Sequence, residues 1–176
     1  ISSEFVHRSL AMRITADWCS NCPSMAYSME TAKEDLQGKL ELVNLHESGG
    51  LTFNDTYTMR LPYNITGYPT CIVDGRAKAV NYSPSSYTIN IIKNVVYETE
   101  YAYPVTTGIA LESTLTGSQL EVDLSLYIKE ADEYKVTVLL LEDDIIAYQS
   151  GGGNDYEHDH VARLSLSECT GDVVAI

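Results

Sequence analysis

Residues 17–23 read Asp17-Trp18-Cys19-Ser20-Asn21-Cys22-Pro23 and carry a CxxC motif between two regular elements. Residues 10–16 alternate between two faces, as the residues of a strand do. Apolar residues then recur at helical spacing over residues 25–36. Pro23 suits the first turn of a helix, because the backbone N–H that it lacks would be unpaired there. The stretch therefore predicts a strand, a cysteine pair and a helix in direct succession.

A cysteine pair at the start of a helix favours thiol–disulfide chemistry. The helix N-terminus offers unpaired N–H groups and partial positive charge, which stabilise a thiolate. We expect Cys19 to be reached by solvent and to attack, and Cys22, inside the first turn, to resolve the mixed disulfide. Taken alone, however, the CxxC fits half of a zinc site or a static local disulfide equally well.

A second motif follows at residues 63–70, which read Tyr63-Asn64-Ile65-Thr66-Gly67-Tyr68-Pro69-Thr70 and lead into a short apolar strand. Together with the Trp-Cys-x-x-Cys-Pro form, this loop resembles the thioredoxin superfamily over roughly residues 8–101. The resemblance implies a cis Tyr68–Pro69 bond and a substrate groove shaped by Trp18, Tyr68 and Pro69. It also implies that the Tyr68 backbone pairs with an extended protein thiol or disulfide substrate.

Arg13 departs from the pattern of that superfamily. Many thioredoxins carry a buried acid six residues before the first cysteine, where it helps to move protons from the resolving thiol. An arginine cannot act as a base, although it could favour a thiolate nearby. The other interpretation is that Arg13 points to solvent or pairs with a carboxylate. The substitution leaves the redox direction open.

From Pro104 onward the pattern consists of strands only. Apolar residues alternate on both sides of a Gly117-Ser118 turn, and further strands are expected at residues 134–141, 161–166 and 173–176, with a flexible loop at residues 151–154. We therefore predict an α/β thioredoxin-like domain in residues 1–103, followed by an all-β, immunoglobulin-like sandwich in residues 104–176. Such sandwiches use about 100 residues, so this one is expected to be incomplete, with an open edge at residues 172–176.

Two segments of this second part, residues 111–117 and 156–163, are similar to the 28-kilodalton outer-membrane-protein-like group of bacterial envelope proteins. That resemblance implies an exported, envelope-associated protein and no established catalytic activity. Within the second segment, His158 and His160 share one face of a strand. Two imidazoles are too few for a structural zinc site without a third ligand. We expect a polar pair at a strand edge, and no metal or cofactor.

The composition limits the partners. The formal net charge of −14 argues against nucleic acid and against an anionic membrane surface. No apolar run reaches the roughly 20 residues that span a bilayer. The chain begins at Ile1 without an initiator Met or a signal peptide, as expected for a mature or trimmed product.

Two functions remain open. The first is an extracytoplasmic thiol–disulfide oxidoreductase acting on protein thiols in the periplasm, in the outer membrane or at the cell surface. The alternative is an envelope or surface binding protein whose CxxC is a structural disulfide. An envelope partner or self-association through residues 104–176 is expected. A reduction potential below about −300 mV would mark a structural bridge.

Overall fold

The computed structural model describes residues 5–80 and 85–175. Its helices are α1 (Cys22–Leu36), α2 (Thr56–Arg60) and α3 (Ser85–Ala102), with a 3₁₀ turn at Leu61–Tyr63. Its strands are β1 (Ser9–Thr15), β2 (Leu40–His46), β3 (Thr70–Val73), β4 (Ala77–Val80), β5 (Thr107–Thr116), β6 (Gln119–Ile128), β7 (Glu133–Val136), β8 (Leu139–Glu142), β9 (Ile145–Gln149), β10 (Gly153–His158), β11 (Val161–Ser165) and β12 (Asp172–Ala175).

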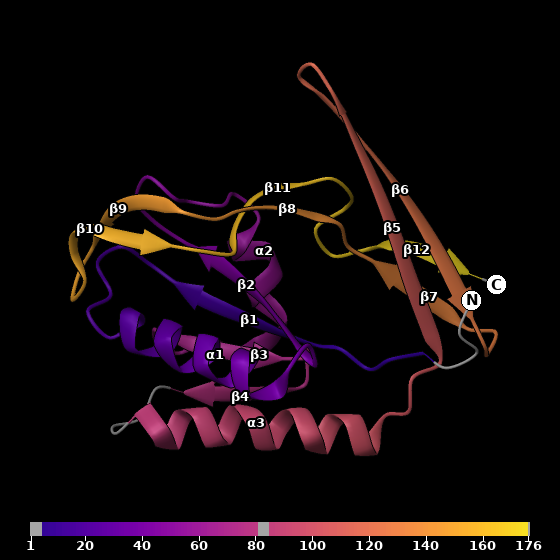
Figure 1. The fold of residues 1–176 in the computed structure, drawn as a ribbon, viewed down its shortest axis with the longest axis horizontal. Coiled ribbons are helices and arrows are strands. Elements are labelled where there is room, and N and C mark those ends of the chain that lie inside the picture. The colour runs from indigo at the N-terminus through magenta and orange to yellow at the C-terminus, as the bar shows by residue number, and fades with distance from the viewer. Residues whose placement is uncertain (1–4, 81–84, 176) are drawn as a thin grey trace.

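The centre of the molecule is a six-stranded mixed sheet in the order β4-β3-β1-β2-β11-β8 (Figure 1). β1 runs parallel to β2 and antiparallel to β3, and β3 pairs antiparallel with β4. β11 joins the outer edge of β2, where Val161 lies opposite Asn44, and β8 pairs antiparallel with β11. Strands from both sides of the expected boundary at residues 103 and 104 therefore share one sheet.

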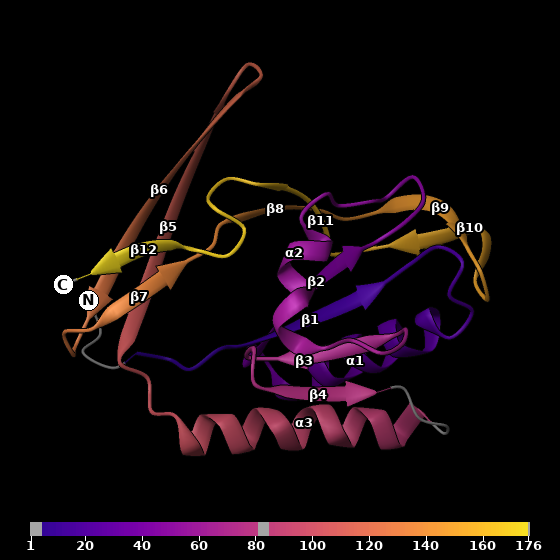
Figure 2. The same ribbon diagram turned by 180° about the vertical axis from the view of Figure 1, so that it is seen from behind.

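Helices cover both faces of this sheet. α1 and α3 pack on one face, where Met25 and Met29 of α1 meet Leu42 and Ile92. The other face holds a second cluster that includes Ile14, Leu45, Phe53 and Ile72, with α2 lying over it (Figure 2). A fully buried Leu or Ile contributes about 1.5–3 kcal/mol, so these two layers account for much of the stability. The CxxC lies at the end toward which β1 points.

The elements expected in the first part of the chain are confirmed in their order. β1, the cysteine pair and α1 follow one another as the sequence predicts, and the Pro69 loop leads into β3. β2 and α2 lie between α1 and that loop, and β4 and α3 follow β3. In the hairpin turn, Asp74 and Gly75 have φ of 51° and 63°. Both angles suit the tight turn that an Asp-Gly pair favours.

The prediction of an immunoglobulin-like sandwich in residues 104–176 is wrong. Among the described residues, this part forms three two-stranded sheets, β5–β6, β9–β10 and β7–β12, and contributes β8 and β11 to the central sheet. The strand expected at residues 134–141 is two strands, β7 and β8, and β9 and β10 occupy residues around the expected loop. The physical reason lies in β2, whose residues 42–46 are all buried: its outer edge needs a partner strand, and β11 supplies it. The division of the chain into two folding units stays a prediction.

The β5–β6 hairpin extends away from the central sheet (Figures 1 and 2). Its strands pair over ten residues each, with Leu115 opposite Leu120 beside the expected turn. Ile109 and Leu115 are 67% and 69% exposed. At the other end of the chain, β12 pairs with β7, and no second partner of β12 is found among the described strands.

Candidate functional site around the cysteine pair

Cys19 and Cys22 form a disulfide, and both residues are buried, at 4% and 1% exposure. Cys22 begins α1, and its backbone N–H donates to the Cys19 carbonyl at 3.2 Å. The Cys19 N–H donates in turn to the Ala16 carbonyl at 3.1 Å. The expectation that solvent reaches Cys19 is therefore wrong for this state of the protein.

Tyr68 covers the disulfide from the loop before β3. It packs against the small cluster of Ala16, Cys19 and Cys22, and the Tyr68–Pro69 bond is cis, as the sequence predicts. Trp18 meets the Tyr68 ring edge to face, with the ring centroids 5.3 Å apart, and is itself 59% exposed. The fold thus brings Trp18, Tyr68 and Pro69 to the cysteine pair.

Gln149, at the end of β9 in the other half of the chain, donates to the backbone beside the disulfide. Its buried side-chain nitrogen Nε2 lies 2.9 Å from the carbonyl oxygen of Cys19 and 3.1 Å from that of Ala16. The Ser150 N–H also donates to the Asp17 carbonyl at 2.7 Å. Sequence reasoning missed Gln149, because one glutamine in an alternating strand carries no signal of its long-range partners.

Arg13 lies buried beneath the start of α1. Its Nε donates to Asn44 Oδ1 at 2.8 Å, and its Nη1 donates to the Cys22 carbonyl at 3.0 Å. Within the described part of the chain, Arg13 makes no ion pair with a carboxylate. The expectation of solvent exposure or a carboxylate partner is therefore wrong. Arg13 instead holds the carbonyl group of a disulfide cysteine.

Two buried histidines lie beside Arg13. The rings of His46 and His158 meet edge to face, with centroids 5.2 Å apart. Burial, together with the positive charge of Arg13, lowers the pKa of His46 to about 3 and lowers the pKa of His158 as well. His160 differs, because its hydrogen bond to Glu30 raises its pKa. The expected polar pair at a strand edge is wrong, because His158 is buried at the end of β10 whereas His160 lies beyond it, before β11.

The His46→Gln substitution should flatten the acid side of the pH–stability profile. The folded-state pKa of His46 is about 3 and the unfolded value is about 6.5, so below pH 6.5 the unfolded state binds a proton that the folded state does not. Stability is therefore full above about pH 6.5 and is lost as the pH falls toward 3. Between pH 6.5 and 4.5, urea denaturation should show wild type losing about 2 kcal/mol more than His46→Gln.

His160→Gln is the matched control for this prediction. The folded-state pKa of His160 is raised, so its contribution is present below the unfolded pKa and is lost as the pH rises through the folded value. The difference between His160→Gln and wild type should therefore change in the opposite sense. Identical profiles for wild type and His46→Gln would contradict the buried neutral state of His46.

Two further groups of reactive residues lie away from the disulfide. Burial raises the pKa of Cys71 to about 12, which is typical of an inert core thiol. The carboxylates of Asp144, Glu157 and Asp159 gather within 4.8 Å of one another, a cluster that sequence reasoning missed. Acidic groups of this kind are common at protein surfaces, and we assign this cluster no role.

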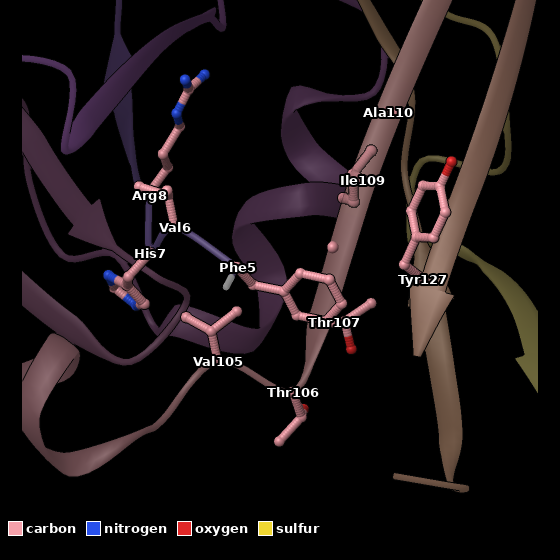
Figure 3. Close-up of a pocket in the computed structure, with 11 residues that line it drawn as sticks. Phe5, Val6, His7, Arg8, Val105, Thr106, Thr107, Ile109, Ala110 and Tyr127 are labelled. Carbon is pink, nitrogen blue, oxygen red and sulfur yellow. The ribbon is translucent and has the colours of Figure 1, made fainter. Parts of the chain in front are cut away.

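A cavity of about 870 Å³ also lies away from the cysteines. It is lined by the N-terminal segment, residues 5–8, and by the base of the β5–β6 hairpin. The Phe5 ring lies against β5, and Tyr127 stands on β6 (Figure 3). A Cβ at Gly108 would come within 2.8 Å of the Phe5 ring. Close packing of Phe5 therefore holds the base of the hairpin against the segment before β1.

A comparison with protein families gives the relationship of this chain. The model of the family described as outer membrane protein Omp28 matches residues 55–176. The chain belongs to the Omp28 family. Membership supports an envelope location for this Omp28-family chain, as its resemblance to the 28-kilodalton group implied. The matched residues do not include Cys19 or Cys22, so membership gives no information on the chemistry of the disulfide.

Solved structures share the fold of this Omp28-family chain. HBP35 of Porphyromonas gingivalis matches with a TM-score of 0.81 and 20% identity, over 99% of this chain and 62% of HBP35. Protein AGR_C_4864 of Agrobacterium tumefaciens matches with a TM-score of 0.65 and 12% identity, over 98% of this chain and 79% of that protein. This chain thus spans less than two thirds of the length of HBP35, and identities this low show the fold alone.

No curated protein sequence matches the chain. Among the described residues, no helix combines the length and the apolar character that crossing a membrane requires.

Proposed function

We propose that this chain is a cell-envelope binding protein in which the Cys19–Cys22 disulfide has a structural role. The observation that carries the proposal is the burial of both cysteines, with Tyr68 packed against them and Gln149 bonded to the Cys19 carbonyl. A thiolate must reach a sulfur atom to exchange with a disulfide. A buried bridge is protected from that attack, and it closes the turn at the start of α1 to which Gln149, from the C-terminal half of the chain, donates.

The disulfide then acts as a local brace. Arg13 on β1 donates to the Cys22 carbonyl, and Gln149 on β9 donates to the Cys19 carbonyl. The disulfide therefore fixes the positions of the two carbonyl groups that these side chains bind. In the chain-entropy account, closing so short a loop contributes about 2 kcal/mol. That value is large against the marginal stability of a folded domain.

A thioredoxin-like unit in residues 1–103 is part of the same proposal. Its support is the order of elements, in which a CxxC follows β1 and the Tyr68-Pro69 loop precedes β3 beside it. The fold of that superfamily hosts redox enzymes, but a fold does not determine function.

The second candidate is an extracytoplasmic thiol–disulfide oxidoreductase. One specific observation favours it, namely the position of the cysteine pair at the start of α1, where the helix terminus stabilises a thiolate. Cys19 would attack, Cys22 would resolve, and Trp18, Tyr68 and Pro69 would hold a protein substrate. Its weakness is the burial of Cys19, the residue that must meet the substrate.

An assay of disulfide reduction separates the two candidates. With dithiothreitol as the electron donor and insulin as the substrate, we expect wild type and the Cys19→Ser/Cys22→Ser double variant to give the same rate, equal to that of dithiothreitol alone. Cys169→Ser, which removes a partly exposed free thiol, serves as the matched control. Turnover that depends on Cys19 would contradict the structural role and support the oxidoreductase.

A partner would bind through the C-terminal strands. The exposed apolar residues Ile109, Leu111 and Leu115 of the β5–β6 hairpin support contact with an envelope partner or with a second copy of the chain. The proposal predicts that one of these two partners contacts the hairpin. It also predicts that the protein is located in the periplasm, in the outer membrane or at the cell surface.

A further inference from the structure

The β9–β10 hairpin reaches the residues around the disulfide through a side-chain amide that donates to backbone carbonyls. Gln149 Nε2 lies within 3.2 Å of the carbonyl oxygens of Ala16, Asp17 and Cys19. The Cys19 carbonyl belongs to the turn that the disulfide closes, and Ala16 and Asp17 lie directly before that turn. The hydrogen bonds of Gln149 therefore depend on the position of the backbone that the Cys19–Cys22 disulfide holds.

The loop between β9 and β10 also packs closely against the residues between the two cysteines. Gly151 follows Gln149 after one residue, and a Cβ built on it would lie 2.3 Å from the Ser20 carbonyl oxygen. Its φ of +80° is also a conformation that only glycine adopts readily. Glycine at this position therefore lets the β9–β10 loop lie directly on the residues between the two cysteines.

The hairpin is separate from the central sheet. Among the described strands, β9 pairs with β10 alone, in a two-stranded sheet of its own. An isolated two-stranded hairpin is marginally stable in water, so its docking depends on contacts with the rest of the molecule. Ile146 and Tyr148 on β9 are exposed. Opening of the β9–β10 hairpin would therefore break the packing of His158 on His46 but none of the strand pairing described for the central sheet.

We propose that the β9–β10 hairpin is an autoinhibitory cap that blocks thiol attack on the Cys19–Cys22 disulfide. When the cap opens, a dithiol reductant attacks a cysteine sulfur, the Cys19–Cys22 bond breaks, and a mixed disulfide forms. The second thiol of the reductant then releases the protein. Two electrons and two protons pass to Cys19 and Cys22, and the reductant leaves as a disulfide.

This inference goes beyond the structural role proposed above. The structural role concerns the equilibrium potential of the disulfide, whereas the cap controls the rate of its reduction. Exchange at a covered site follows the population of the open form when opening and closing are fast. The cap rests on the same contacts of Gln149 as the structural role, but a changed rate and a changed potential are measured separately, so the failure of one proposal is distinguishable from the failure of the other.

Gln149→Glu is the test of the cap. A carboxylate keeps the size of the glutamine side chain, cannot donate to the Ala16, Asp17 and Cys19 carbonyls, and is repelled by their oxygens. The rate of reduction by dithiothreitol at pH 7, read by alkylation and mass spectrometry of Cys19 and Cys22, should rise at least tenfold over wild type. Gln119→Glu, the same change at an exposed position on β6, should leave the rate unchanged.

Hydrogen exchange distinguishes cap opening from global unfolding. In Gln149→Glu, the amides of residues 145–158 should exchange faster, while those of β1 keep the wild-type rate. Gly151→Ala provides a second variant should Gln149→Glu fail to fold, and it should also speed reduction at least tenfold. A folded Gln149→Glu or Gly151→Ala that is reduced at the wild-type rate would overturn the cap, as would equal acceleration by Gln119→Glu.

Discussion

Ala162→Asp should lower the free energy of unfolding by about 4 kcal/mol and the melting temperature by roughly 8–16 °C. Ala162 lies on β11, is fully buried, and belongs to the same cluster as Ile14, Val43 and Ile72. An aspartate there would bury an unpaired carboxylate in an apolar layer. The cost is large only if β11 is an integral strand of the central sheet, so this variant tests the architecture directly.

Leu164→Asp is the matched control on the same strand. Leu164 is 52% exposed, so a carboxylate at this position stays in water and should change the free energy of unfolding by less than about 1 kcal/mol. Thermal unfolding by circular dichroism measures both variants. A melting temperature for Ala162→Asp within 2 °C of wild type, on the scale of a surface change, would mean that β11 does not pack in this core.

The first part of the fold could be predicted because its signals are local. The alternation before Asp17, the helical spacing after Pro23 and the Asp74-Gly75 turn each lie within one element or one turn. Tyr68-Pro69 was expected beside the cysteines through the family resemblance. These residues lie where they were expected, and Tyr68 packs against Cys19 and Cys22.

The second part could not be predicted, because alternation shows which face of a strand is buried but does not name its partner. β11 has the same pattern as a sandwich strand, yet it pairs with β2 across more than a hundred residues of sequence. One signal was present. Val161 and Ala162 are adjacent and both apolar, and both are buried, as expected for a strand covered on both faces.

The prediction of the candidate site from the sequence was incomplete for the same reason. Cys19 was expected to be exposed because Gln149, which closes over it, lies 130 residues further along the chain. Arg13 was expected to meet solvent or a carboxylate, but it meets the carbonyl of Cys22 and the amide of Asn44. A backbone carbonyl offers no sequence pattern, so partners of this kind cannot be inferred from residue types.

The second large effect concerns the reduction potential of the Cys19–Cys22 pair, which should lie below about −300 mV. The oxidised form positions the Cys19 carbonyl for Gln149 and the Cys22 carbonyl for Arg13. The hydrogen bond from the neutral Gln149 amide contributes about 1 kcal/mol, and the one from the charged Arg13 guanidinium contributes about 1.5–3 kcal/mol. Since 30 mV corresponds to about 1.4 kcal/mol, favouring the disulfide by about 3–4 kcal/mol lowers the potential by roughly 65–85 mV from a glutathione-like value near −230 mV, to roughly −300 mV.

Equilibration in dithiothreitol redox buffers, followed by acid quenching, alkylation and mass spectrometry of Cys19 and Cys22, measures this potential directly. The structural role of the disulfide predicts a value below about −300 mV, with the pair fully oxidised in a glutathione buffer at −230 mV. A value between about −270 and −120 mV, the range of thiol–disulfide catalysts, would contradict the structural role and make the oxidoreductase the better account.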